Sequence, residues 1–192
     1  GHSQYYDPSG HSMRKEFLRN PIDFARISSR FNLKRKHPVL NKFRAHRGTD
    51  YAAVTGTPIK STGDGKVIFA GRKGGFGNCV IIQHGSRYQT LYAHLSKFNR
   101  KARKGRRVKQ GQVIGYVGST GLATGPHLHF EFRVDGVHRD SLRVKLPKSR
   151  AISKDQKPAY KAEAARMIEW LQSQQSTQLA NDDSLESNTS LR

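Results

Sequence analysis

Polar and apolar residues alternate strictly over the stretch HLHFEFRV, residues 127–134. A period of two places the apolar residues on one face of a β-strand and the polar residues on the other. The polar face carries His127, His129, Glu131 and Arg133. Asp135 and Gly136 follow, a pair that favours a two-residue hairpin turn, so the chain is predicted to fold back from Val137. Both histidines are therefore predicted to lie on regular β-structure.

Short runs of β-type composition continue this pattern from Thr57 to about Leu142, separated by glycine-rich turns. The runs are KVIFAG, NCVIIQHG, YQTLYAHLS, QVIGYVGS and HLHFEFRV. Short strands at regular spacing are typical of an antiparallel all-β domain. We predict an all-β core of antiparallel sheets within residues 38–146.

The segments on either side of this core differ from it. Residues 1–37 are polar and basic, and we predict an N-terminal arm that lies on the domain through apolar anchors; residues 1–3 resemble the remainder of an expression tag. The anchors are Phe17, Leu18, Ile22, Phe24, Ile27 and Phe31. Residues 147–171 are predicted to form a linker and one amphipathic helix, because apolar residues from Tyr160 to Leu171 recur at helical spacing. Residues 172–192 contain few apolar residues and are predicted to be disordered.

The charge of the chain points to anionic partners. Its 192 residues contain 35 Lys and Arg against 14 Asp and Glu, a net charge of +21. Nucleic acid, acidic glycans and anionic membranes are all compatible with this excess. Eight basic residues lie in the single connection KFNRKARKGRRVK, residues 97–109, which either captures an anionic polymer or is an ordinary solvated loop. Nucleic-acid binding is disfavoured, because the connection lacks interleaved aromatic residues and any recognisable binding motif.

Other compositional features bound the compartment only loosely. The single cysteine, Cys79, cannot form an internal disulfide and lies in an apolar run typical of a buried strand. No apolar run reaches the ~18 residues of a membrane-spanning helix, and the sequence carries no recognisable signal peptide.

Potential metal ligands occur in three places along the chain. His46 lies four residues before Asp50 in HRGTDYAA, His94 lies in YAHLS, and His127 and His129 form the HxH pair. Zinc in a catalytic site takes three protein ligands and leaves a fourth position open. His46, Asp50 and one histidine of the pair supply such a set; Gly48 and Thr49 favour a turn or bulged strand there rather than a helix. Taken alone, a turn-capping Asp beside an exposed His is equally compatible with the HxxxD spacing.

These motifs, in this order, resemble the lysostaphin/LytM-type zinc metallopeptidases from about Pro38 to Leu142. The segments FLRNPIDFARISSRFN and HPVL also resemble the approach to the catalytic domain of Gram-negative periplasmic murein DD-endopeptidases. The resemblance implies a fold of the LytM/lysostaphin type (a duplicated hybrid motif) and a Zn²⁺ cofactor. It implies that His46, Asp50 and His129 bind the metal and that His94 and His127 are catalytic, while substrate-binding residues remain unknown.

The implied activity is hydrolysis of peptide cross-links in peptidoglycan, specifically bonds between D-alanine and meso-diaminopimelate, in the periplasm or cell envelope of a Gram-negative bacterium. One alternative is an autoinhibited or regulatory LytM-type protein that activates a cell-wall amidase, with the arm covering the site. The intact motif positions disfavour a degenerate member. Neither the bond cleaved, the identity of the general base nor the oligomeric state follows from sequence.

Several further residues have two interpretations. Glu131 either orients a metal ligand by contacting it on the side away from the metal, or is simply solvated. Asn78 is a candidate hydrogen-bond donor to substrate, and Gly74, Gly75 and Gly77 either allow a substrate backbone to approach or form a glycine-rich hairpin. No role is predicted for the remaining histidines, which are His2, His11, His37, His84 and His138.

Overall fold

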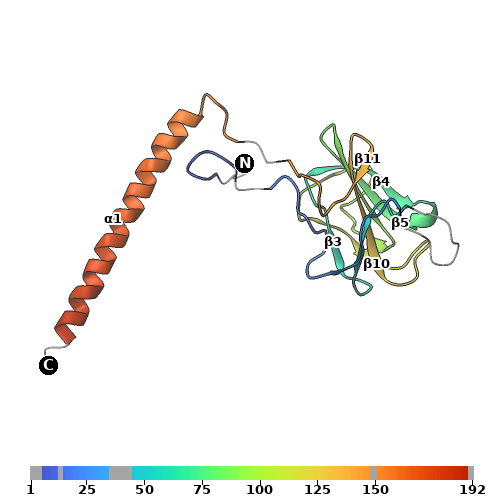
Figure 1. Ribbon diagram of the computed structural model, residues 1–192, viewed down its shortest axis with the longest axis horizontal. Coiled ribbons are helices and arrows are strands. Elements are labelled where there is room, and N and C mark those ends of the chain that lie inside the picture. Colours follow the sequence, from blue (N-terminus) through green and yellow to red (C-terminus); the bar gives the residue numbers. More distant parts are fainter. Residues whose placement is uncertain (1–5, 13–14, 35–44, 148–150, 190–192) are drawn as a thin grey trace. The chain divides into compact units, whose positions relative to one another are not determined.

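The computed structural model describes residues 6–12, 15–34, 45–147 and 151–189. The chain divides into two compact units, one of Glu16–Pro147 and one formed by Gly1–Lys15 with Lys148–Arg192. The first unit contains every described strand, and the second contains the long helix α1 (Figure 1).

Two antiparallel sheets make up the first unit. The larger sheet has eight strands, in spatial order β1 (Arg26–Ser29), β2 (Thr49–Ala52), β10 (His127–Val134), β6 (Tyr88–Ala93), β5 (Asn78–His84), β4 (Gly65–Arg72) and β8 (Arg107–Val108), with β11 (Val137–Arg139) also paired to β10. The smaller sheet has the order β3 (Pro58–Lys60), β9 (Val113–Val117) and β7 (Leu95–Phe98). A single 3₁₀ turn, η1 (Gly74–Phe76), precedes β5. The predicted all-β, antiparallel core is confirmed.

Strand β10 follows the predicted alternation. Leu128, Phe130 and Phe132 are at most 2% exposed and belong to the main hydrophobic core, whereas the residues between them lie on the opposite face of the sheet. Asp135 and Gly136 have φ values of +50° and +77°, as a two-residue hairpin turn requires. The predicted hairpin between β10 and β11 is confirmed.

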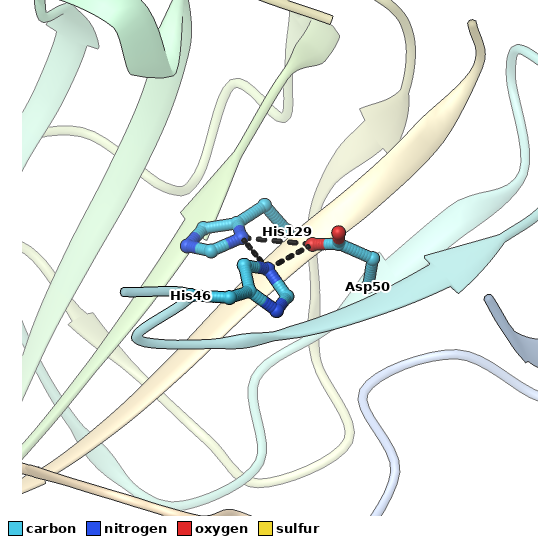
Figure 2. A group of neighbouring side chains, drawn as sticks. All are labelled: His46, Asp50 and His129. Carbon is cyan, nitrogen blue, oxygen red and sulfur yellow. Dashed lines mark hydrogen bonds and ion pairs between the residues drawn. The ribbon is translucent and has the colours of Figure 1, made fainter. Parts of the chain in front are cut away.

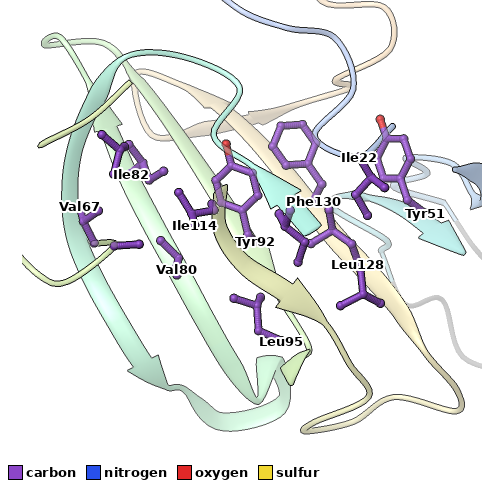
Figure 3. Close-up of a cluster of buried hydrophobic side chains, with 14 of the residues drawn as sticks. Ile22, Tyr51, Val67, Val80, Ile82, Tyr92, Leu95, Ile114, Leu128 and Phe130 are labelled. Atoms are coloured by element: carbon purple, nitrogen blue, oxygen red, sulfur yellow. The ribbon is translucent and has the colours of Figure 1, made fainter. Parts of the chain in front are cut away.

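The main core fills the space between the two sheets (Figure 3). Val80, Tyr92 and Phe130 from the larger sheet pack with Leu95 and Ile114 from the smaller one, and all are at most 1% exposed. The buried hydroxyl of Tyr92 is satisfied by hydrogen bonds with the backbone N–H and the hydroxyl of Thr62 at 2.9 and 3.0 Å. Apolar side chains fill the space between the sheets, so the other face of the larger sheet is available for polar groups.

A second, smaller cluster lies on that other face of the larger sheet. Cys79, Ile81 and Leu91 are buried there, with Phe69 and Phe76 packed over them. Burial raises the pKa of the Cys79 thiol to about 11, so it is protonated at neutral pH. This agrees with the prediction that Cys79 is a small buried residue.

The predicted N-terminal arm is divided between the two units. Phe17 and Ile22 are 3% and 2% exposed within the main core, and Arg26–Ser29 pair with β2, so residues from Glu16 onward belong to the sheet unit. Phe24, also predicted as an anchor, is fully exposed. The predicted domain boundary at residues 37 and 38 lies outside the described residues, as do residues 1–3.

The second unit differs from the prediction for the C-terminal segment. Helix α1 spans Lys157–Thr189 and therefore continues beyond Leu171, where a disordered tail is predicted. Residues 172–189 contain neither Gly nor Pro, so no residue there interrupts the backbone hydrogen bonds of a helix. The apolar residues of the predicted amphipathic face are not buried; Met167, Trp170 and Leu171 are each more than half exposed. Near its start, the helix is fixed to the N-terminal residues by the Tyr160 hydroxyl, which donates to the Tyr6 carbonyl at 3.1 Å.

Among the helices within the described ranges, none has both the length and the apolar character needed to span a membrane.

Phe17 provides a test of how firmly the arm is built into the sheet unit. Its ring makes edge contacts with His84, Tyr88 and Phe132 at centroid distances of 5.0, 5.5 and 5.2 Å. We expect Phe17→Ala to lower the free energy of unfolding by about 3–5 kcal/mol, because it removes a buried aromatic ring and leaves a cavity. Phe24→Ala, in the same arm, is the matched control and is expected to change it by less than about 0.5 kcal/mol. Urea denaturation of both variants makes the comparison, and equal losses would contradict the assignment of Phe17 to the core.

Candidate active site

The register between β2 and β10 brings the HxxxD and HxH motifs together. Asp50 on β2 is directly opposite His129 on β10, so their side chains project from the same face of the sheet. The His129 ring nitrogen Nδ1 lies 2.8 Å from Asp50 Oδ1 (Figure 2). Two motifs separated by 79 residues therefore meet through one strand pairing.

His46 reaches the same point from the loop before β2. Its backbone forms an isolated bridge with Asn32, and its Nε2 lies 3.1 Å from Asp50 Oδ1 and 3.3 Å from His129 Nδ1. The chain bends at Gly48, where a Cβ atom would lie 2.5 Å from Cε1 of His129. The spacing of His46 and Asp50 thus arises from a bend into a strand, as predicted, and not from a helix.

In both His46 and His129, the ring nitrogen that faces away from Asp50 lies against a hydrogen-bond acceptor. His46 Nδ1 lies 2.8 Å from the Arg30 carbonyl, which can only accept, so Nδ1 carries the proton and Nε2 is the bare nitrogen. His129 Nε2 lies 3.3 Å from Glu131 Oε1, which leaves Nδ1 facing Asp50. The hydrogen bonds therefore orient one ring nitrogen of each histidine toward the common point.

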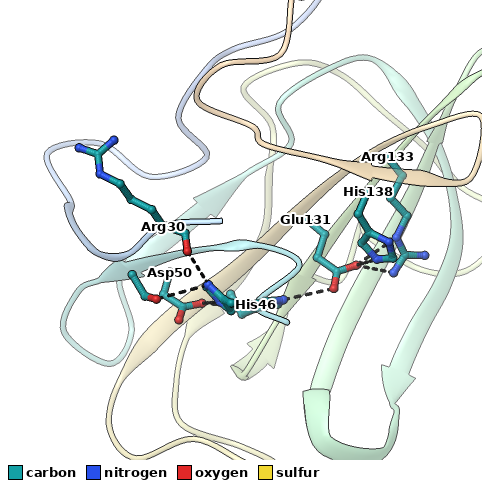
Figure 4. A network of polar contacts seen from close by, with 8 residues as sticks. Arg30, His46, Asp50, Glu131, Arg133 and His138 are labelled. Carbon is teal, nitrogen blue, oxygen red and sulfur yellow. Dashed lines mark hydrogen bonds and ion pairs between the residues drawn. The ribbon is translucent and has the colours of Figure 1, made fainter. Parts of the chain in front are cut away.

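Glu131 is itself fixed by two further residues (Figure 4). Its Oε2 accepts hydrogen bonds from the Arg133 guanidinium and lies 3.0 Å from His138 Nε2. Burial would raise the pKa of Glu131, but the hydrogen bonds from His129 and Arg133 outweigh it and lower the pKa to about 2. A buried, ionised carboxylate therefore stands behind His129.

The three converging atoms fit a metal ion. His46 Nε2, Asp50 Oδ1 and His129 Nδ1 all lie within 4.8 Å of one another. Zinc bonds of about 2.0–2.2 Å in a tetrahedron place ligand atoms about 3.3–3.6 Å apart, close to the separations of 2.8, 3.1 and 3.3 Å found here. Three potential ligand atoms directed at one point suit a cation, and nitrogen and carboxylate ligands suit zinc.

The electrostatics of the cluster also favour a cation. Burial would raise the pKa of Asp50, but the contacts with the His129 and His46 imidazoles outweigh it and hold the pKa below its ordinary value. Burial would lower the pKa of His129, yet the Asp50 and Glu131 carboxylates on its two nitrogens raise the pKa to about 9. The same carboxylates stabilise a proton or a metal ion on Nδ1.

His94 lies beside this cluster in a restrained conformation. It follows β6 with φ at +63°, its backbone N–H donates to Phe76 at 2.9 Å, and its Nδ1 donates to the Thr120 carbonyl at 2.7 Å. The proton is therefore on Nδ1, and Nε2 is free to accept. Burial lowers the pKa of His94, which keeps the imidazole neutral at pH 7.

His127 completes the group of imidazoles. Its Nδ1 donates to the Gly125 carbonyl at 2.8 Å, which likewise leaves Nε2 as the bare nitrogen. The His94 and His127 rings have centroids 4.7 Å apart, and the His94 and His129 rings 6.1 Å apart. Two imidazoles that present Nε2 thus lie next to the candidate metal site, an arrangement that suits general acid–base chemistry.

Two loops meet backbone to backbone behind His94. A Cβ at Gly77 would lie 2.3 Å from the carbonyl carbon of Thr120, and one at Gly121 would lie 2.4 Å from the Gly77 nitrogen. The Leu122 N–H donates to the Gly75 carbonyl at 2.8 Å across the same contact. Gly74, Gly75 and Gly77 lie in the hairpin connection between β4 and β5, and Gly77 also serves the contact between the two loops.

The structure brings together all five residues predicted for the site, and it adds three that sequence reasoning missed. Those three are Arg30, through its carbonyl, Arg133 and His138. His138 was detectable, because the two-residue turn places it directly opposite Arg133. Asn78, a predicted substrate donor, instead donates from Nδ2 to the Leu95 carbonyl at 3.1 Å.

Comparison with known proteins agrees with this geometry. The sequence model of peptidase family M23 matches residues 44–141. The chain is 47% identical over 168 residues to the peptidoglycan DD-endopeptidase ShyC of Vibrio cholerae, covering 88% of this chain and 38% of that protein. It is 50% identical over 127 residues to the DD-carboxypeptidase/endopeptidase Mpg of Neisseria meningitidis, covering 66% of this chain and 29% of that protein. The chain thus spans less than half the length of these curated relatives.

Solved structures give the same assignment. A zinc-containing peptidase from Vibrio cholerae superposes with a TM-score of 0.67 at 45% identity, covering 75% of this chain and 44% of that one. The catalytic domain of lysostaphin from Staphylococcus simulans superposes with a TM-score of 0.54 at 32% identity, covering 60% of this chain and 88% of that one. With the family match over residues 44–141, these similarities establish that the chain belongs to peptidase family M23.

Proposed function

We propose that this chain is the catalytic part of a zinc-dependent endopeptidase that cleaves peptide cross-links of peptidoglycan, at bonds between D-alanine and meso-diaminopimelate. The observation that carries the proposal is the convergence of His46 Nε2, Asp50 Oδ1 and His129 Nδ1 beside two further imidazoles. Relatives named as peptidoglycan DD-endopeptidases support the substrate class. The same relatives support a location in the periplasm or cell envelope.

In this proposal the five residues divide into ligands and acid–base groups. His46, Asp50 and His129 hold the metal, which when bound supplies Lewis-acid polarisation of the scissile carbonyl and acidifies water. His94 and His127 share proton transfer and stabilisation of the developing oxyanion through their Nε2 atoms. The carbonyls of Thr120 and Gly125 keep both rings in the tautomer that presents Nε2.

The regulatory alternative receives no support from the described part of the arm. Within that part, Arg30 contributes a carbonyl to His46, and no arm residue belongs to the group of potential ligand atoms. The arm supports a ligand there and does not replace one.

Digestion of purified sacculi tests the proposal directly. We expect the zinc-loaded chain to release soluble fragments whose new termini are D-alanine and the side-chain amine of meso-diaminopimelate, identified by mass spectrometry. Chelation of the metal should stop release, and added zinc should restore it. Stimulation of an added amidase without new termini at D-alanine and at the diaminopimelate side-chain amine would instead establish the regulatory alternative.

Variants of the histidines separate ligands from acid–base groups. His129→Ala is expected to lose zinc and turnover together, because a site with three protein ligands has no spare donor. His127→Ala and His94→Ala should keep about one zinc per chain while losing about 10²–10⁴-fold in rate. Elemental analysis and hydrolysis of a soluble cross-linked peptide are measured on all three proteins at one pH. Retention of zinc by His129→Ala together with its loss from His127→Ala would reverse the assignment.

Glu131 is predicted to act on the metal through His129. Glu131→Gln removes the charge behind the ligand and should weaken zinc binding by about 10–100-fold in competition with a chromophoric chelator. Asp135→Asn is the matched control, since it makes the same change in an exposed turn carboxylate that pairs with Arg87. Zinc affinity equal in the two variants would show that Glu131 does not tune the site.

A further inference from the structure

All eight basic side chains of the connection between β7 and β8 are exposed, and Lys97 lies over the Tyr116 ring at 4.9 Å from its centroid. In the described part of the chain, none of the seven basic side chains within residues 100–109 forms an ion pair. They are Arg100, Lys101, Arg103, Lys104, Arg106, Arg107 and Lys109. Asp64, an acidic residue close to this connection, already accepts a hydrogen bond from the Gln110 backbone at 2.6 Å. The connection is therefore a concentrated and uncompensated positive charge.

The backbone of this connection is nevertheless fixed. Ala102 is 1% exposed within the main core, and its N–H donates to the Asn99 carbonyl at 2.9 Å. The Gly105 N–H donates to the Val67 carbonyl at 2.7 Å, and the Val67 N–H returns a bond to Arg106 at 2.8 Å. An ordinary solvated loop has no need of such anchoring. A fixed backbone presents the charges in one arrangement, which lowers the entropy lost on binding.

One basic residue of the connection lies opposite a like charge on the neighbouring strand. Arg107 on β8 lies directly opposite Lys66 on β4, and both side chains are exposed on the same face. Like charges at directly opposite positions destabilise a strand pair. A bound anion between them would turn this repulsion into a binding site.

The pair lies on the sheet face that carries the active site. The register runs without interruption from Arg107 through Lys66, Gln83 and Gln89 to Arg133. Arg133 is four residues after His129 on the same strand and therefore on the same face. Four strand spacings separate β8 from β10, about 19 Å. A polymer held at the basic edge would thus reach Arg133, four residues from His129 on β10, along one polar row.

We propose that Lys66 and the basic connection of residues 97–109 form a docking surface for an anionic, carboxylate-bearing wall polymer, held while its peptide is presented to the active site. The proposal rests on the proposed function for the identity of that polymer as peptidoglycan. Nucleic acid is disfavoured, because Phe98 packs against the core and no exposed aromatic residue lies between the basic ones. An anionic membrane is disfavoured because residues 99–107 offer no exposed apolar side chain for insertion.

Charge neutralisation tests this surface. The variant Arg103→Gln, Lys104→Gln, Arg106→Gln, Arg107→Gln is compared with Arg26→Gln, Lys34→Gln, Arg139→Gln, Lys145→Gln, which removes four exposed charges elsewhere in the same unit. Both are placed in a His127→Ala background, so that sacculi are bound without being digested. We expect the first variant to bind sacculi about 10-fold or more weakly and with a shallower salt dependence, and the control to change about twofold or less.

Activity is measured separately with the His127 side chain restored. Hydrolysis of a short soluble cross-linked peptide should be equal in both variants, because such a substrate does not reach the basic edge. If neither the wild type nor either variant hydrolyses the peptide, the proposed function is contradicted. The comparison of sacculus binding would still test the docking surface. Equal loss of sacculus binding in both variants would overturn the docking surface. So would a variant that loses binding to duplex DNA or to vesicles of anionic lipid but still binds sacculi.

Lys66→Gln gives a second readout, in which stability and binding to sacculi are expected to change in opposite directions. Relief of the repulsion with Arg107 should raise the midpoint of thermal unfolding by about 1 °C or more, while binding to sacculi weakens. A Lys66→Gln variant that binds sacculi as the wild type does would overturn the part that the proposal gives to Lys66.

Discussion

The antiparallel register between β2 and β10 is the constraint on which the site depends. It places Asp50 opposite His129 and so joins two motifs far apart in the sequence. Side chains alternate between the two faces of a strand, so a slip of one residue would turn His129 into the core and Leu128 toward Asp50. The packing of Leu128, Phe130 and Phe132 between the sheets excludes that slip. Hydrophobic burial on one face therefore determines which side chains meet on the other.

Hydrogen bonds then decide which nitrogen each imidazole presents. His46, His94 and His127 each donate Nδ1–H to a backbone carbonyl, whereas His129 has the Glu131 carboxylate at Nε2. The carbonyls belong to the scaffold, so these tautomers are built into the fold before any ligand arrives. Glu131 differs because it is a charged partner, and Arg133 and His138 offset the cost of burying it.

Sequence patterns anticipated the sheet architecture and the five central residues of the site. Alternation along β10 and the turn at Asp135 depend on local chemistry, which the sequence displays directly. The backbone partners of the histidines could not be predicted from the sequence, because Arg30 acts through its carbonyl and any residue type supplies one. The extent of α1 was also missed, since a polar composition predicts poor burial but does not prevent a helix. Resemblance to the family supplied the proposed division between ligands and acid–base residues, which spacing alone left open.

The contact between Gly77 and Gly121 makes the two loops behind His94 a single module. His94 donates one hydrogen bond to each loop, from its backbone N–H to the Phe76 carbonyl and from Nδ1 to the Thr120 carbonyl, so its ring is positioned by the contact as a whole. A loop transplanted from another peptidase would bring a side chain, or a differently shaped backbone, against its partner at under 3 Å. Grafting experiments that alter specificity through this region would therefore need to exchange both loops together.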